Sequence, residues 1–142
     1  MTALRAGDLT LGQTFETVLV DDLKRTQIVQ YAGASGDYNP LHTDEIYATK
    51  VAGYPSVLAH GMLTMGLTGR AIAALVGGES LVRFGVRFTA PVWPGDTLAV
   101  RATVARVDMT DNGLVAEFSV STVNGAGREV ASGYAHACLD AS

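Results

Sequence analysis

Two hydrophobic patterns divide the chain into a helical part and a strand-rich part. From Gly61 to Val76 apolar residues cover nearly the whole surface of a helix, and Arg70 is the only charged residue. A helix that is apolar nearly all round is buried on most of its sides. Residues 81–92, "LVRFGVRFTAPV", instead alternate with a period of two, which is typical of a strand. Together the patterns predict one buried helix beside a sheet.

Shorter segments predict the elements before this helix. Residues 13–20, "QTFETVLV", are rich in β-branched side chains and predict a first strand. Asp21 is a candidate N-cap for a helix that Gly33 and Gly36 would end. Residues 44–50, "DEIYATK", predict a second, short helix.

The last third of the chain predicts long strands joined by short turns. "TLAVRATVARV", "LVAEFSVSTV" and "EVASGYAHACL" are separated by "DMTDNG" and "NGAGR", and the turn "WPGD" follows residues 81–92. Consecutive strands with short connections form an antiparallel meander, which we expect residues 81–92 to begin. The prediction is an α+β fold in which an antiparallel sheet wraps around the buried helix, in one domain over residues 1–142.

Composition narrows the class of protein. The chain has 142 residues, of which 48% are hydrophobic and 17% charged, so we expect a folded core. A net charge of -4 gives no general basic field, so we expect no nucleic-acid partner. The single cysteine, Cys138, excludes an internal disulfide and predicts a cytoplasmic location, as does an N-terminus without a signal-peptide pattern. Pro55, His60 and Arg70 interrupt the most apolar window, so we expect no membrane span.

Residues 31–48, "YAGASGDYNPLHTDEIYA", concentrate the candidate chemistry. Asp37 and His42 are five positions apart, and Pro40 stiffens the chain between them. A carboxylate and an imidazole titrate at different pH values, so the two could hold one water for acid–base chemistry. The amide of Asn39 could brace this loop. Taken singly, the Asp also fits a turn and the His a helix cap.

A second candidate segment, "AHGM", stands where the buried helix begins. The first amides of a helix lack internal partners and lie at its electropositive end, and Gly61 allows close approach of a ligand. An oxyanion would be stabilised there. The alternative is that Gly61 only starts the helix and His60 packs against it. The three histidines show no metal-ligand spacing, so we expect no metal site.

These segments resemble the MaoC-like dehydratases, a family that includes the (R)-specific enoyl-CoA hydratases. The resemblance extends over about residues 10–139 and includes "AHGML", "VRFTAPV" and "PGDTL" besides the loop. The loop residues that match the family signature are Tyr31, Ser35, Gly36, Asp37, Asn39, Pro40, Leu41, His42 and Ala48.

The resemblance implies a hot-dog fold, a dimer and a thioester substrate. It implies that Asp37 and His42 hold the catalytic water, with their acid and base roles unassigned, and that the Gly61 N–H receives the thioester oxygen. No metal or redox cofactor is then needed, since CoA or acyl-carrier protein (ACP) carries the substrate. We expect substrate contacts from Asn39, His60, Met62 and Thr64, and candidate tunnel liners at Met62, Met65, Leu67 and Trp93.

The predicted activity is reversible hydration of trans-2-enoyl-CoA or enoyl-ACP to the (R)-3-hydroxyacyl thioester, which is hydro-lyase chemistry in fatty acid metabolism. The chain also looks like the catalytic subunit of bacterial elongation dehydratases built from two MaoC-like subunits, so the dimer is a homodimer or a heterodimer with another hot-dog subunit. Two alternatives remain, a non-catalytic thioester-binding subunit and a hot-dog thioesterase. The intact Asp37/His42 pair argues against the first, and the Asn-Pro-x-His loop against the second.

Overall fold

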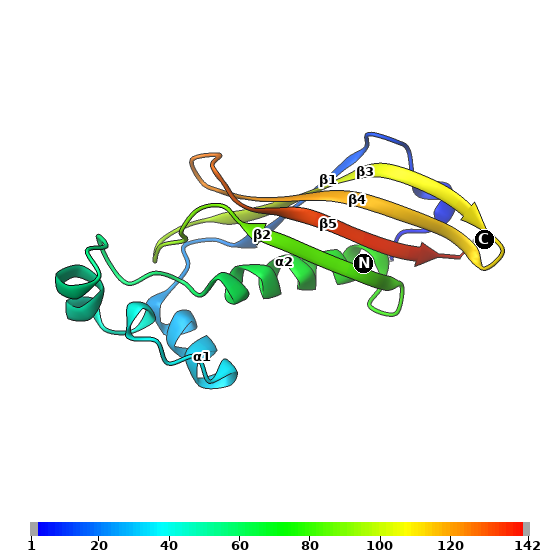
Figure 1. Ribbon diagram of the computed structural model, residues 1–142. Helices are drawn as coiled ribbons and strands as arrows, with labels where there is room; N and C mark the ends of the chain where they lie inside the picture. The colour runs from blue at the N-terminus through cyan, green and yellow to red at the C-terminus, as the bar shows by residue number, and fades with distance from the viewer. Residues whose placement is uncertain (1–2, 141–142) are drawn as a thin grey trace.

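A five-stranded antiparallel sheet curves around one long helix in the computed structural model, which describes residues 3–140 (Figure 1). This is the α+β architecture that the hydrophobic patterns predict, and it has the form of a hot-dog fold. The main elements are β1 (Thr14–Val20), α1 (Arg25–Ser35), α2 (Gly61–Val76), β2 (Leu81–Phe88), β3 (Leu98–Thr110), β4 (Gly113–Asn124) and β5 (Glu129–Leu139).

The strand order is β1-β3-β4-β5-β2, so the predicted meander is confirmed for β3 to β5. The prediction that β2 begins this meander is wrong, because β2 pairs with β5 at one edge while β3 pairs with β1 near the other. Residues 89–97 make the crossover, and their two prolines lack the N–H groups that a tight hairpin needs. The Ala59 N–H donates to the Val92 carbonyl at 2.8 Å, so the crossover passes beside the start of α2.

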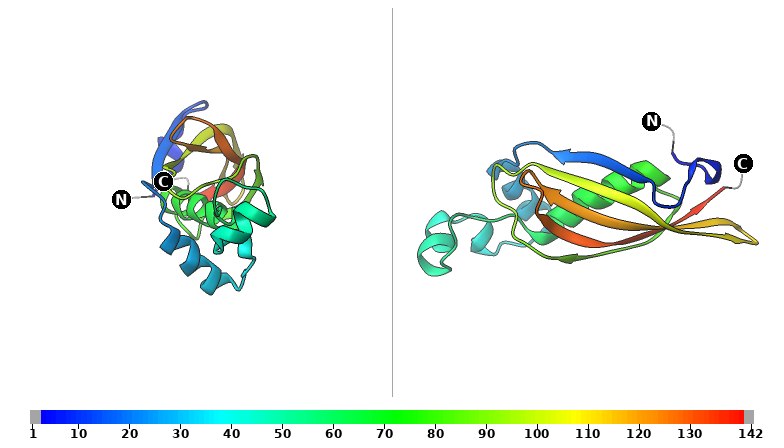
Figure 2. Two further views of the ribbon diagram at one scale, coloured as in Figure 1. Left: turned by 90° about the vertical axis from the view of Figure 1, so that its left-hand side faces the viewer. Right: turned by 90° about the horizontal axis from the view of Figure 1, so that it is seen from above.

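Helix α2 has the bounds that its apolar pattern predicts, but only one side of it is buried in this chain. Leu63, Leu67 and Ile72 pack into the core against the sheet. Met62 is 55% exposed, and Arg70 lies on the same open side. Figure 2 shows the sheet curving around one side of the helix only. Within residues 3–140, no helix is both long enough and apolar enough to cross a membrane.

Helix α1 begins later than the sequence predicts. Asp21 is not its N-cap: the helix starts at Arg25, and no side chain caps it. The reason is a long-range contact, because the Leu23 N–H donates to the Asp96 carbonyl at 2.9 Å and holds the preceding residues against the crossover. The Asp21 carboxylate accepts a hydrogen bond from Thr97 there. The helix ends at Gly36 (φ 77°), as predicted, whereas Gly33 lies within it.

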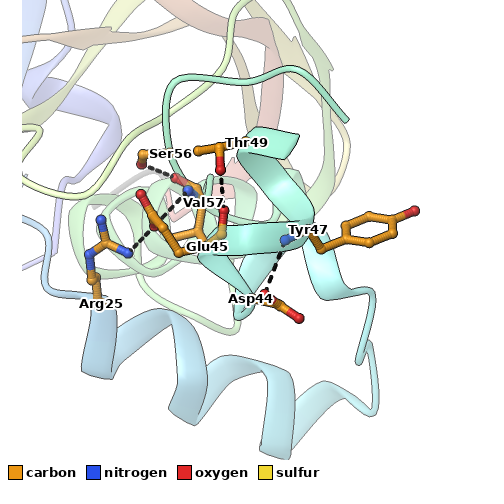
Figure 3. Close-up of polar contacts among 7 residues, drawn as sticks. All are labelled: Arg25, Asp44, Glu45, Tyr47, Thr49, Ser56 and Val57. Atoms are coloured by element: carbon orange, nitrogen blue, oxygen red, sulfur yellow. Dashed lines mark hydrogen bonds and ion pairs between the residues drawn. The ribbon is translucent and has the colours of Figure 1, made fainter. Parts of the chain in front are cut away.

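The chain between α1 and α2 forms an overhang, residues 37–60, that projects beyond the sheet at the left of Figure 1. The short helix predicted at 44–50 is a single π-helical turn, Tyr47–Val51. The Arg25 guanidinium pairs with the Glu45 carboxylate and thereby ties the overhang to α1 (Figure 3). The hydrogen bond from Arg25 lowers the pKa of Glu45 and raises the pKa of Arg25.

Candidate active site

The loop that carries the acid–base candidates is braced by its own side chains. The Asp37 N–H donates to Ser35 Oγ at 3.1 Å, and the Asn39 N–H donates to Asp37 Oδ1 at 3.2 Å. Asn39 Oδ1 in turn accepts from the Leu41 N–H at 3.0 Å, where Pro40 begins a 3₁₀ turn. These local bonds occupy one carboxylate oxygen of Asp37 and leave Oδ2 available. In this structure the Asn39 amide oxygen therefore braces the loop.

Asp37 and His42 face each other across a gap. Asp37 Oδ2 lies 4.0 Å from His42 Nε2, which is too far for a direct hydrogen bond and short enough for one bridging water. His42 Nδ1 lies 2.7 Å from the Leu58 carbonyl oxygen. A carbonyl oxygen can only accept, so Nδ1 carries a hydrogen and the Nε2 of the neutral ring presents a lone pair to the gap. Both groups at the gap are thus acceptors when Asp37 is ionised.

His60 lies behind this pair and is almost fully buried. Its ring stacks on His42 with centroids 3.7 Å apart, and Tyr31 meets it edge-on at 4.8 Å. His60 Nε2 lies 3.0 Å from the Asp37 carbonyl oxygen, whereas Nδ1 has no hydrogen-bond partner among residues 3–140. The sequence predicts a substrate contact for His60, but its 2% exposure leaves little surface for one.

Gly61 is the first residue of α2, directly after His60. Its N–H finds no acceptor in the described part of the chain, as expected for the first turn of a helix. A Cβ on this residue would lie 2.8 Å from Phe88 Cε2, so the glycine lets the Phe88 ring cover the start of the helix. The Phe88 ring therefore lies against the N-terminal end of α2, where the helix dipole is positive and the Gly61 N–H is free.

Two hollows adjoin this point and share Gly61 and Phe88 in their walls. One, of about 370 Å³, contains Asp37, His42 and His60. The other, also about 370 Å³, lies beyond Phe88 and has mostly apolar walls from the crossover and the start of α2. Met62 lines the first hollow, whereas the hydroxyl-bearing Thr64 lines the second.

Asp37, His42 and His60 are the described residues that come together as a possible metal cluster, with ligand atoms within 4.8 Å of one another. The two imidazoles are stacked with only 24° between their planes. Imidazole lone pairs lie in the ring plane, so these point side by side and do not meet at one ion. The Nε2 of His60 is also engaged with Asp37. The arrangement suits two hydrogen-bonding rings better than a shared metal.

The sequence does not reveal the part that some residues play in the site. Phe88 belongs to the family-like segment "VRFTAPV", but its pattern predicts only a place in an alternating strand, and its contact with Gly61 depends on pairing across the sheet. Leu58 contributes a backbone carbonyl, which no side chain pattern reveals. The predicted liners Met65, Leu67 and Trp93 line neither of the two hollows.

Residues 8–125 match the family model described as MaoC like domain. The chain belongs to this family. The loop that supplied the resemblance, with Asp37 and His42, lies inside the matched segment.

Individual relatives of this MaoC-like domain carry hydratase or dehydratase names. The 3-hydroxyacyl-thioester dehydratase Y of Mycobacterium tuberculosis is 47% identical over 68 residues, which cover 46% of this chain and 23% of that protein. The peroxisomal enoyl-CoA hydratase 2 of Arabidopsis thaliana is 40% identical over 85 residues, or 58% of this chain and 27% of that protein. The chain thus spans about a quarter of the length of these curated relatives.

A solved structure supports the fold over nearly the whole chain. The unliganded R-hydratase PhaJ1 from Pseudomonas aeruginosa superimposes with a TM-score of 0.78 at 29% identity, covering 96% of this chain and 85% of that chain. The expected hot-dog architecture is therefore confirmed by comparison as well as by the sheet itself.

Proposed function

We propose that this MaoC-like domain catalyses the reversible addition of water to a trans-2-enoyl thioester, giving the (R)-3-hydroxyacyl thioester. The proposal rests above all on the 4.0 Å gap between Asp37 Oδ2 and His42 Nε2, next to the free N–H of Gly61. The hydratase and dehydratase names of the relatives support it.

The gap would orient a water for attack. A water between two acceptors donates one hydrogen to the Asp37 carboxylate and the other to His42 Nε2. With both hydrogens engaged, the lone pairs of its oxygen are free to face the substrate. The water is then a preoriented nucleophile beside two groups that can remove its proton.

The reaction begins when the water oxygen forms a bond to C3 of the enoyl thioester. One water proton passes to Asp37 or His42, and the double-bond electrons move towards the thioester oxygen, which becomes an enolate. The Gly61 N–H and the positive end of α2 stabilise that charge. The pair then returns one proton to C2, so protons and charge balance. The same steps in reverse dehydrate the 3-hydroxyacyl thioester, and neither direction needs a metal or redox cofactor.

The acyl chain of the substrate would occupy the apolar hollow beyond Phe88. Its walls include Thr64, Val92 and Val130, and it joins the acid–base site at Gly61. The exposed Met62, which lines the hollow that contains Asp37 and His42, would contact the carrier end of the thioester. CoA and ACP both supply such a thioester. Because Cys138 is the single cysteine of the sequence, we propose a reducing compartment such as the cytoplasm.

A second hot-dog chain is the partner that we propose. Strand β2 is an edge strand whose outer side pairs with no described strand, and Val82 on it is 63% exposed. Unprotected edge strands pair readily with another chain. Pairing through β2 would bring the partner next to Phe88 and the site.

Sedimentation of the purified chain gives a homodimer if this pairing through β2 holds. A monomer that forms a dimer only with a second hot-dog protein would favour the heterodimer.

The activity is tested by following the ultraviolet absorbance of short and long trans-2-enoyl-CoAs while a thiol reagent monitors free CoA. Loss of absorbance without thiol release, with a chiral assay that finds the (R)-alcohol, is the expected result. Thiol release would make the protein a thioesterase. Binding without either change, for CoA and ACP thioesters alike, would make it a binding subunit.

A further inference from the structure

We infer that His60 is a positioning residue that holds the Asp37/His42 pair in place relative to the amide of Gly61. The inference rests on the proposed hydration, because it assigns His60 a part in the same site. It replaces the direct substrate contact expected from the sequence with a contact through the two acid–base residues.

His60 contacts each component of the site in a different way. Its Nε2 donates to the Asp37 carbonyl oxygen at 3.0 Å, and its ring stacks on His42 at 3.7 Å. Its backbone is the N-cap of α2, and its carbonyl accepts the first hydrogen bond of that helix, from the Leu63 N–H at 3.1 Å. Gly61 follows directly. One residue therefore links the backbone of Asp37, the His42 imidazole and the proposed oxyanion donor.

The choice of an imidazole here is informative. Because the Asp37 carbonyl only accepts, the hydrogen of the neutral His60 ring is on Nε2, and Nδ1 is left without a partner among the described residues. A phenyl ring would fill the same buried space and stack on His42 with no polar atom left over. The imidazole adds only the hydrogen bond to Asp37. That bond is the feature we expect catalysis to depend on.

The loop needs this anchor because little else holds it. Every residue from Gly36 to Pro40 is exposed, the bond between Asp37 and Asn39 lies within the loop, and the bond to Ser35 reaches only the last residue of α1. His42 has its own anchor in the Leu58 carbonyl. Without the bond to His60, the Asp37 carboxylate can move relative to His42, and the water that both must hold is no longer fixed.

Two variants of similar size separate the hydrogen bond from the stack. His60→Gln places an amide N–H near the Nε2 position but loses the aromatic stack, whereas His60→Phe keeps the stack and loses the donor. For enoyl-CoA hydration we expect kcat of His60→Gln to stay within about tenfold of wild type and kcat of His60→Phe to fall about 100-fold, since small displacements of catalytic groups have effects of that size. KM should change less than about threefold in both, because His60 is buried behind the pair.

A His60→Phe variant as active as His60→Gln would overturn the inference, and so would a rise in KM with kcat unchanged. A magnetic-resonance readout remains if a variant fails to fold or if wild type hydrates no enoyl thioester. In ¹⁵N-labelled wild type we expect the His60 hydrogen on Nε2. The Tyr38 amide, which shares its peptide group with the Asp37 carbonyl, should shift more in His60→Phe than in His60→Gln.

A hydrogen found on Nδ1 of His60 would contradict the inference whatever the activity. If only the proposed function is wrong, wild type will not hydrate enoyl thioesters although the His60 hydrogen is found on Nε2. The two failures are therefore distinguishable.

Discussion

A hollow lies at each end of helix α2, and the two hollows differ in the chemistry of their walls more than in their volumes. At the C-terminal end a hollow of about 500 Å³ is lined by residues that include Arg5, Glu79 and Asp140. The hollow with Asp37 and His42 at the N-terminal end is smaller, about 370 Å³. Only at the N-terminal end does the positive end of the helix dipole lie beside a carboxylate and an imidazole whose facing atoms, 4.0 Å apart, can be bridged by one water. Convergent polar groups identify the site better than size does.

Removing the acid–base pair should have the largest effect. For Asp37→Asn and for His42→Gln we expect kcat to fall by about 10²–10⁴-fold, the range for a general acid or base. The double variant should be little worse than either single one, because the two hold the same water. Steady-state hydration of enoyl-CoA measures this. Glu79→Gln, at the opposite end of α2, is the matched control and should turn over like wild type. Near-normal turnover in either single variant would remove the pair from the mechanism.

The free amide at the N-terminal end is tested by Gly61→Pro against Gly61→Ala. Proline suits the first position of a helix, and His60 before it has the extended backbone (ψ 135°) that proline requires, so α2 should form. Both variants put a Cβ against Phe88, but only proline removes the N–H. We expect Gly61→Pro to be about 10²–10³-fold slower in kcat than Gly61→Ala. Equal rates would show that this amide does not stabilise the enolate.

Opening the wall between the two hollows should have a moderate effect on specificity. Phe88 separates the acid–base site from the apolar hollow, so Phe88→Ala enlarges the path for the acyl chain. We expect the ratio of kcat/KM for long to short enoyl-CoAs to rise about tenfold, as for similar changes in apolar pockets. Val18→Ala, an exposed position on β1 at the opposite edge of the sheet, serves as the control. An unchanged ratio would mean that the acyl chain lies elsewhere.

The smallest effect, a change in Tm, should come from breaking the Arg25–Glu45 ion pair that ties the overhang to α1. Arg25 lowers the pKa of Glu45, so their pair stabilises the fold above the ordinary Glu pKa of 4.5, and this contribution disappears as the pH falls through the lowered value. Both groups are exposed, so the gain is small. The Tm difference between wild type and Arg25→Gln should be greatest at neutral pH and vanish in acid. Arg128→Gln, which removes no ion pair of the described residues, should show no such pH dependence. A difference that persists in acid would exclude the ion pair as its cause.

What the sequence predicted well depends on local patterns. The bounds of α2 follow from its apolar surface, and the loop with Asp37 and His42 follows from its residue types. The errors have long-range causes. The start of α1 is set by the contact of Leu23 with Asp96, and the place of β2 by pairing with β5. Backbone groups such as the Leu58 carbonyl complete the site and have no pattern of their own.

The separation of the reactive loop from the core has a consequence for how such proteins can diverge. The core cluster takes its side chains from the sheet, α1, α2 and the segments that flank them, and residues 33–58 contribute none to it. A duplicated copy could therefore lose Asp37 and His42 without losing its ability to fold or to expose its β2 edge. Selection could then keep one copy for chemistry and the other for assembly and substrate shape. A single ancestral gene of this kind is sufficient to produce a two-subunit enzyme.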